Sequence, residues 1–211
     1  MRARITLTAT VLVGVATLLL SACGNDAKPS DTIKGAQTGP APSPSASVAD
    51  AAHRPKITLP ADVHDVFEDT STGDPTKDAI WSDAAQRVMA LDEAKAEGNP
   101  RLPALLYYSA PLAQASAYQS VERDVQHGYS ITGTDRYYAP DITVRNDTAT
   151  LNYCSDESKW FTKVRKTGKV MTTPVDKNSY VWHITGLKQN AAGVWQTAFV
   201  NTQRGATQCE S

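Results

Sequence analysis

The stretch SYVWHITGLKQNAAGVWQTAFVNT, residues 179–202, decides the fold. It holds two runs rich in β-branched and aromatic residues, 179–188 and 194–202, joined by a short linker that ends in Gly193, which is typical of a β-hairpin. Apolar side chains occupy both odd and even positions in each run, so both faces of each strand are apolar. We therefore predict two strands from the middle of a sheet, with a covering layer on each face.

The residues before this hairpin alternate with the same period of two. Their breaks contain turn-forming residues such as Pro140 and Asn146, and the weaker last pair flanks Gly168. Together with the hairpin they predict an antiparallel meander. The predicted strands are 130–138, 142–145, 148–154, 159–166 and 169–175.

Further upstream the apolar period becomes helical. Asp74 can cap a helix whose first turn holds Pro75, and Gly98 ends it. Shorter helices are predicted at 101–108 and 111–127. The first helix has an apolar stripe, and its charged residues fall mostly outside this stripe; they are Asp78, Asp83, Arg87 and Asp92.

The N-terminus resembles that of bacterial lipoproteins. Basic residues precede an uncharged apolar run, Ile5 to Leu20, and Leu20-Ser21-Ala22-Cys23 resembles a lipobox. The resemblance implies a signal peptide at 1–22, a palmitate-bearing lipid on Cys23, and anchoring in the bilayer on the extracytoplasmic face of the cell membrane. The alternative is an ordinary signal peptide followed by a chance cysteine.

Residues 23–74 are predicted to be a disordered tether. They collect six of the twelve prolines and have no aromatic residue before Phe67, so they can bury little apolar surface. The more apolar segment 57–67 is expected to fold back on the domain as a short arm. The remaining 75–211 suit one globular domain.

Charge and cysteine content exclude some functions. Without residues 1–22, 19 basic residues face 22 acidic ones, which does not suit nucleic acid. In an exported chain the remaining pair, Cys154 and Cys209, predicts a disulfide, with a buried free thiol as the alternative. No histidine lies at ligand spacing from them, so we expect no metal site and no cofactor.

Two short motifs resemble the nuclear-transport-factor-2-like (ketosteroid-isomerase-like) superfamily. One is Gly98-Asn99-Pro100-Arg101-Leu102, between the first two helices, and the other is Gly193-Val194-Trp195-Gln196-Thr197, at the last strand. The resemblance implies an α+β fold in which N-terminal helices pack on a curved antiparallel sheet, cone-like, with a pocket at the open end. The superfamily includes both enzymes and binding modules, so the fold leaves function open.

Four residues are candidates for lining that pocket: His183, Asp135, Tyr107 and Tyr138. His183 shares a strand face with Val181, Thr185 and Leu187, which favours a hydrogen-bonded packing role over catalysis. Asp135 is expected to be a solvated strand charge, with a general base as the alternative. The tyrosines are expected to pack.

The chain has no nucleotide-binding loop, nucleophile motif or internal repeat, which counts against an enzyme. We predict a membrane-anchored domain that binds a small apolar ligand or an envelope protein. An isomerase or lyase of the ketosteroid-isomerase type is the alternative, and a structural accessory of an envelope complex is the third hypothesis. The basic run from Lys159 to Lys169 predicts a soluble protruding hairpin, or else a contact with anionic lipid or wall polymers.

Overall fold

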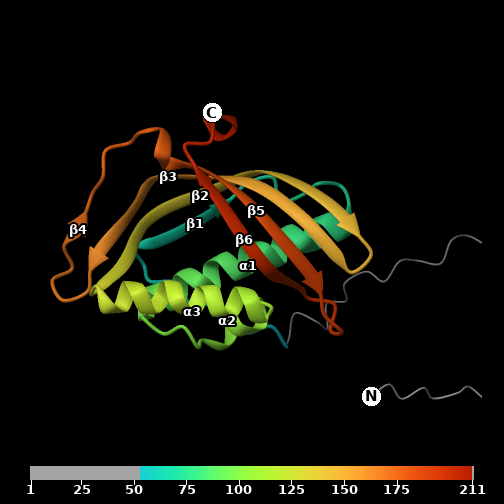
Figure 1. The fold of residues 1–211 in the computed structure, drawn as a ribbon, viewed down its shortest axis with the longest axis horizontal. Helices are drawn as coiled ribbons and strands as arrows, with labels where there is room; N and C mark the ends of the chain where they lie inside the picture. Colours follow the sequence, from blue (N-terminus) through green and yellow to red (C-terminus); the bar gives the residue numbers. More distant parts are fainter. Residues whose placement is uncertain (1–52, 211) are drawn as a thin grey trace, which may run out of the picture. The chain divides into compact units, whose positions relative to one another are not determined.

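The computed structural model describes residues 53–210. Three helices lie on one face of a curved sheet (Figure 1), which confirms the α+β prediction of helices packed on a sheet. The helices are α1 (Pro75–Glu97), α2 (Pro103–Tyr107) and α3 (Pro111–Gln126). The strands are β1 (Val63–Phe67), β2 (Tyr129–Arg145), β3 (Thr148–Val164), β4 (Val170–Met171), β5 (Tyr180–Gln189) and β6 (Trp195–Arg204). Two short 3₁₀ helices, η2 (Lys177–Ser179) and η3 (Thr207–Cys209), flank the last two strands.

The strands form one sheet in the order β1-β2-β3-β5-β6, and β4 pairs with β3. Every pair is antiparallel except β1 and β2, which run parallel. The meander is therefore confirmed, but two of its predicted breaks are not. Strand β2 runs through Pro140 with a bulge, and β3 joins the predicted strands 148–154 and 159–166.

Helix α1 follows its predicted signals. The Asp74 side chain accepts hydrogen bonds from the backbone N–H groups of Thr76 and Lys77, and Gly98 ends the helix with a positive φ of 76°. Its pattern of buried residues differs from that of a helix with a single apolar stripe, because the sheet covers one side of α1 and helices α2 and α3 cover another. As a result Asp83, Arg87 and Asp92, expected outside the apolar stripe, are buried.

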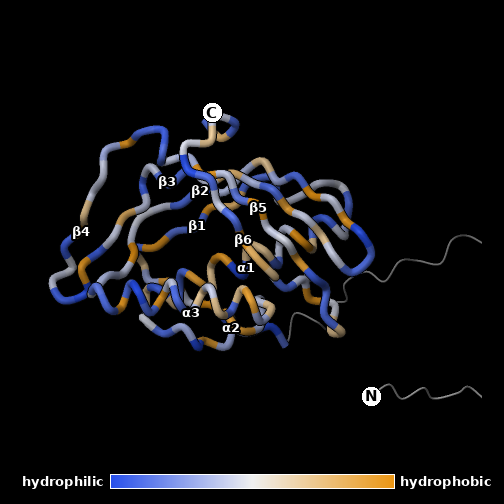
Figure 2. The backbone as a smooth tube through the Cα atoms, viewed as in Figure 1, coloured by the Kyte–Doolittle hydropathy of each residue, from blue (hydrophilic) through white to orange (hydrophobic). Residues whose placement is uncertain are grey.

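The main apolar core lies between α1 and the sheet. Trp81 and Ile80 of α1 pack there against Leu151 and Tyr153 of β3 and Trp195 of β6. A second cluster joins α1 to α2 and α3 through Ala90, Ala94, Leu105, Ala117 and Val121. Figure 2 shows these apolar segments of α1 and the strands facing one another, whereas the loop that carries β4 is largely hydrophilic.

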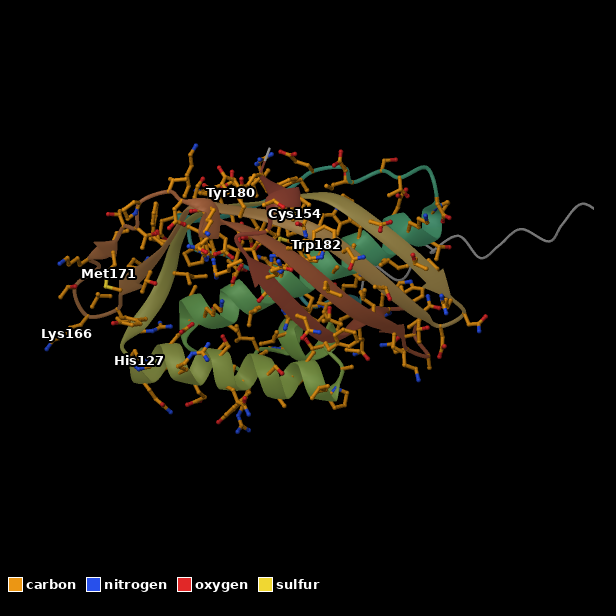
Figure 3. The ribbon with its side chains drawn as sticks, turned by 45° about the horizontal axis from the view of Figure 1, so that its top comes forward. His127, Cys154, Lys166, Met171, Tyr180 and Trp182 are labelled. Atoms are coloured by element: carbon orange, nitrogen blue, oxygen red, sulfur yellow. A yellow bond between two sulfur atoms is a disulfide. The ribbon has the colours of Figure 1, made fainter. Side chains whose placement is uncertain are left out.

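A smaller cluster lies on the opposite face of the sheet (Figure 3). Cys154 of β3 and Cys209 of η3 form a disulfide, as predicted, and thereby hold the C-terminal residues against the strands. Tyr180 and Trp182 pack beside them, and the hydroxyl of Tyr138 donates to the carbonyl of Cys209.

Two predictions need correction. Strand β6 is an edge strand, not a central one, and the outer face of the last hairpin is uncovered in part, so Ile184 and Phe199 are 38 % and 43 % exposed. Segment 63–67 lies in the range assigned to the tether but forms a strand of the sheet, so the folded part begins upstream of Pro75; this agrees with the expectation that 57–67 folds back on the domain. Its alternation buries Val63 and partly buries Asp65 and Phe67 on one side, which suffices for a strand.

The predicted signal peptide, Cys23 and the part of the tether up to residue 52 lie outside the described residues. Within residues 53–210, none of the helices combines the length and apolar character that crossing a bilayer requires.

Candidate functional site

A group of polar side chains interrupts the apolar core where α1 meets the sheet. We call this group the interior site. Strands β1, β2, β3 and β5 contribute to it, as does α1, and the charges and hydroxyl groups interact across these elements. Its members are Asp65, Arg87, Asp92, Asp135, Tyr137, Tyr153 and His183.

The two central groups are Asp65 and Asp135. They are directly paired in the register of the parallel strands β1 and β2, so their side chains leave the sheet side by side on the same face. Asp135 is only 4 % exposed. Both carboxyl oxygens of Asp65 and Oδ1 of Asp135 are buried and have no hydrogen-bond partner within the described residues.

Burial is the main cause of the raised pKa of both carboxyl groups. Desolvation raises the pKa of Asp65, and the charge of Asp92 raises it further, while Lys95 opposes the change. Desolvation likewise raises the pKa of Asp135 well above its ordinary range, with the charge of Glu157 as the next cause. These two acids therefore hold protons at pH values at which exposed carboxyl groups are ionised.

Helix α1 supplies the charges that face this pair. Arg87 is 9 % exposed, and its Nε–H has no hydrogen-bond partner among residues 53–210. Burial lowers the pKa of Arg87, and the charge of Asp92 opposes this change. Asp92 lies 4.0 Å from the ammonium of Lys95, yet burial still raises its pKa.

Aromatic rings form the apolar part of the site. Phe67 stacks on Tyr137 with ring centroids 4.7 Å apart, and Trp81 packs against Tyr153 at 5.2 Å. Burial raises the pKa of Tyr153 to about 12 and raises that of Tyr137 well above its ordinary value, and the charges of Asp135 and Asp92 act in the same direction on both phenols. Both phenols are therefore proton donors, not bases, at neutral pH.

His183 completes the site on β5. Its Nε2 lies 2.9 Å from the hydroxyl oxygen of Ser155, and its ring stacks on Tyr153. Burial lowers the pKa of His183 to about 4, and the charges of Arg204 and Arg87 act in the same direction. The imidazole is therefore neutral over the physiological range and has the hydroxyl partner expected of a packed histidine.

Of the four predicted pocket residues, His183 and Asp135 both lie beside Tyr137 on the helix-facing side of the sheet. The expectation that Asp135 is solvated is wrong, because the parity of β2 turns it towards α1. Tyr138 points to the opposite face and the disulfide, and Tyr107 lies on α2, with its ring against Tyr108. Neither belongs to the interior site.

The sequence analysis missed Asp65, Arg87 and Asp92 as site residues. Asp65 carried a usable signal, since it lies between the two apolar residues Val63 and Phe67 on one face of an alternating segment. The two α1 residues carried none, because their burial depends on how many elements cover the helix.

A second feature lies on the outer face of the sheet. A shallow hollow of about 310 Å³ is lined by Thr143, Thr150, Leu187 and Phe199, with Arg145 and Lys188 at its rim. The basic hairpin forms a separate exposed end, where Lys166 and Met171 lie near the C-terminal end of α3 (Figure 3). Among the described residues, the hollow has no buried polar side-chain atom that lacks a hydrogen-bond partner. The hairpin has one, Nε of Arg165, but the same guanidinium already donates to the carbonyl of Ala96 on α1. The interior site, where several such atoms lie together, is therefore the stronger candidate.

Comparison with known proteins gives matches of structure alone. No protein-family model matches the chain, and no curated protein matches its sequence. Similar solved structures include a ketosteroid isomerase-like protein from Erwinia carotovora atroseptica, with 15 % identity and a TM-score of 0.42, over 60 % of this chain and 93 % of that one. A putative ketosteroid isomerase from Shewanella frigidimarina has 14 % identity and a TM-score of 0.35, over 65 % and 99 %.

A putative dehydratase of the NTF2-like family from Streptomyces avermitilis has 12 % identity and a TM-score of 0.41, over 62 % of this chain and 98 % of that one. These likenesses concern the fold and carry no information about activity. The interior site must therefore be interpreted from its own chemistry.

Proposed function

We propose that this chain is a lipid-anchored protein of the extracytoplasmic membrane face, whose NTF2-like domain binds a small polar molecule at the interior site. The observation that carries the proposal is the pair Asp65 and Asp135, which lie side by side with three buried carboxyl oxygens that have no hydrogen-bond partner in the described part of the chain. Leaving such a group unpaired costs about 1 to 3 kcal/mol. A ligand that donates hydrogen bonds to the three unpaired carboxyl oxygens would therefore recover part of this free energy on binding.

The polarity of the site changes the expected ligand. A small apolar molecule would leave the buried oxygens of Asp65 and Asp135 and the Nε–H of Arg87 unsatisfied, whereas a polar molecule can pair with them. The proposed ligand is therefore polar. Lipid anchoring rests on the lipobox at Cys23 and supplies the setting: a folded domain presented outside the membrane.

An isomerase or lyase is the second candidate. The specific observation in its favour is that Asp135, with a raised pKa, interacts with the hydroxyl of Tyr137 next to Asp65. A carboxyl group able to exchange a proton beside a phenol donor is an acid–base pair. His183, neutral and engaged by Ser155, has no role in this chemistry and keeps its predicted packing function.

The test is a thermal-shift screen of small polar compounds on the full chain, run in parallel on Asp135→Asn. Asp141→Asn, an exposed change on the same strand, is the matched control. Binding at the interior site predicts compounds that raise the melting temperature of the wild type and the control but not of Asp135→Asn. If every stabilising compound acts equally on Asp135→Asn, or none stabilises the wild type, the interior site is not a ligand site and the accessory hypothesis gains.

A further inference from the structure

We propose that the ligand of the interior site is a small organic cation whose ammonium or amidinium group binds between Asp65 and Asp135. This inference rests on the proposed binding function and adds the chemical class of the ligand. Four properties of the site carry it: the unsatisfied acceptors, the balance of charge, the aromatic walls and the protons that the two acids hold.

Unsatisfied acceptors outnumber donors among the charged groups of the site. Three buried carboxyl oxygens, two on Asp65 and one on Asp135, have no donor within residues 53–210, against a single unpaired N–H on Arg87. An ionised carboxylate only accepts hydrogen bonds, whereas a primary ammonium group supplies three donors and no acceptor. Such a group therefore satisfies the oxygens without adding a new unpaired atom.

The carboxyl groups of the neighbourhood outnumber its basic groups. The carboxyl groups are Asp65, Asp92, Asp135 and Glu157, and the basic groups that interact with them are Arg87, Lys95 and Arg204. Lys95 pairs with Asp92 at 4.0 Å and Arg204 with Glu157 at 2.6 Å. Neither Asp65 nor Asp135 forms an ion pair in the described part of the chain, so once either acid gives up its proton an organic cation supplies the missing positive charge, whereas an anion adds repulsion.

The walls suit an organic cation. Tyr137 interacts with both acids, and Phe67 stacks on it from the strand that carries Asp65. Aromatic faces attract cations and pack against the methylene groups that accompany them. No group of three or more histidine, cysteine or acidic side chains in residues 53–210 is spaced for a metal ion, so the aromatic and acidic residues favour a cation with an apolar body.

Cation binding is coupled to proton release. Asp65 faces Asp135 on β2 and Asp92 and Lys95 on α1, while Asp135 faces Tyr137 on its own strand, Glu157 on β3 and Asp92 on α1. Arg87 and the neutral His183 complete the surrounding groups. An incoming cation replaces the positive charge of a proton. The affinity of the site for the cation therefore falls as the pH falls, because a larger fraction of the two acids is protonated.

Calorimetric titration of the full chain in detergent tests the inference. The probes are 1,4-diaminobutane and histamine, with 1,4-butanediol and succinate as neutral and anionic controls of similar size. We expect the amines to bind at pH 8 and to bind at least tenfold more weakly at pH 5.5. Asp65→Asn and Asp135→Asn should each weaken binding at least tenfold, and Asp141→Asn should not change it.

A second measurement needs no variant and guards against loss of folding. Titrations of the wild type at pH 7, in buffers of different ionisation enthalpy, should show protons released when an amine binds. Amine binding without proton release, or unaffected by either substitution, overturns the inference. Binding of the diol or succinate in place of the amines overturns the cation class and leaves the proposed binding function standing. A failure of all four probes, followed by a failed thermal-shift screen, overturns both.

Discussion

The imidazole ring of His183 lies face to face with the phenol ring of Tyr153, with centroids 4.5 Å apart and planes 2° from parallel. The two residues are register partners on β5 and β3, so the stack follows directly from the strand pairing. Ser155, next on the same face of β3, holds Nε2 by a hydrogen bond. The ring is thus fixed by two neighbours on one strand, which is the environment of a packing residue.

His183→Gln should therefore reduce stability without abolishing ligand binding. The loss of the stack and of the Ser155 contact should cost about 1 to 2 kcal/mol at pH 7, measured by urea unfolding. The cost should shrink as the pH falls. The wild-type imidazole, with its pKa lowered from 6.5 to about 4, is charged in the unfolded chain before it is charged in the fold. The wild type therefore loses about 2 to 3 kcal/mol between pH 6.5 and 4, which the glutamine variant does not. A variant with unchanged stability that no longer binds or turns over any ligand would contradict this role.

Asp65→Asn should stabilise the fold at high pH. The pKa of Asp65 is raised from 3.8 to about 8, so between these values the folded state holds a proton that the unfolded state has lost. The contribution of the protonated Asp65 carboxyl group to the stability of the wild type is fully present below pH 3.8 and is lost as the pH rises through 8. We expect the variant to gain about 2 kcal/mol or more over the wild type at pH 8 and to match it near pH 4. Asp141→Asn, measured alongside, should stay within about 0.5 kcal/mol of the wild type at both values. A pH-independent difference for Asp65→Asn would refute the buried, protonated carboxyl group.

Replacing both cysteines of the disulfide by serine should destabilise the domain. The bridge closes a loop with a sequence separation of 55 residues, for which chain entropy predicts up to about 4 kcal/mol. The measured loss should be smaller where the Tyr138 hydroxyl still holds the Cys209 backbone. Urea unfolding gives the size of the effect, and hydrogen exchange should show new exposure confined to η3 and the facing part of β3. Peptide mapping that finds both thiols free in exported protein would contradict the pairing.

Lipid attachment at Cys23 predicts that labelled palmitate enters the protein and that Cys23→Ala prevents it. Without its acyl chains the domain should appear in the medium, because no other acylated residue is expected. Cys154→Ser with Cys209→Ser serves as the control, because these changes remove thiols without touching the lipobox. If the Cys23→Ala protein remained bound to membranes as tightly as the wild type, another anchor would have to be sought.

The helices were predictable because their ends carry strong local signals. Asp74, Pro75 and Gly98 delimit α1 by capping and backbone geometry, which depend on nearby residues alone. The disulfide was predictable from the number of cysteines and the expectation that the chain is exported. The long strand β3 was not, because the polar residues around Glu157 interrupt its alternation where a register shift against β2 occurs.

The interior site was only half predictable. Strand parity grouped His183 with Val181, Thr185 and Leu187, but it does not tell which face of β2 is inward, so Asp135 was assigned to solvent. The edge position of β6 depends on strand order, and the burial of Arg87 and Asp92 depends on packing around α1. The strand order and the packing around α1 are set only when the layers assemble, so the local periodicity of the sequence cannot predict them.

The segment before β1 determines how mechanical load enters the domain. Arg54 pairs with Asp83, and the N–H of Thr58 donates to Glu93 at 2.7 Å, so the chain is fastened to α1 at two points before it joins the sheet. A pulling force that enters the domain at His53 therefore acts on the Arg54–Asp83 and Thr58–Glu93 contacts before it acts on β1. Asp65 lies on that strand, so the two contacts also protect its alignment with Asp135 against tension from upstream.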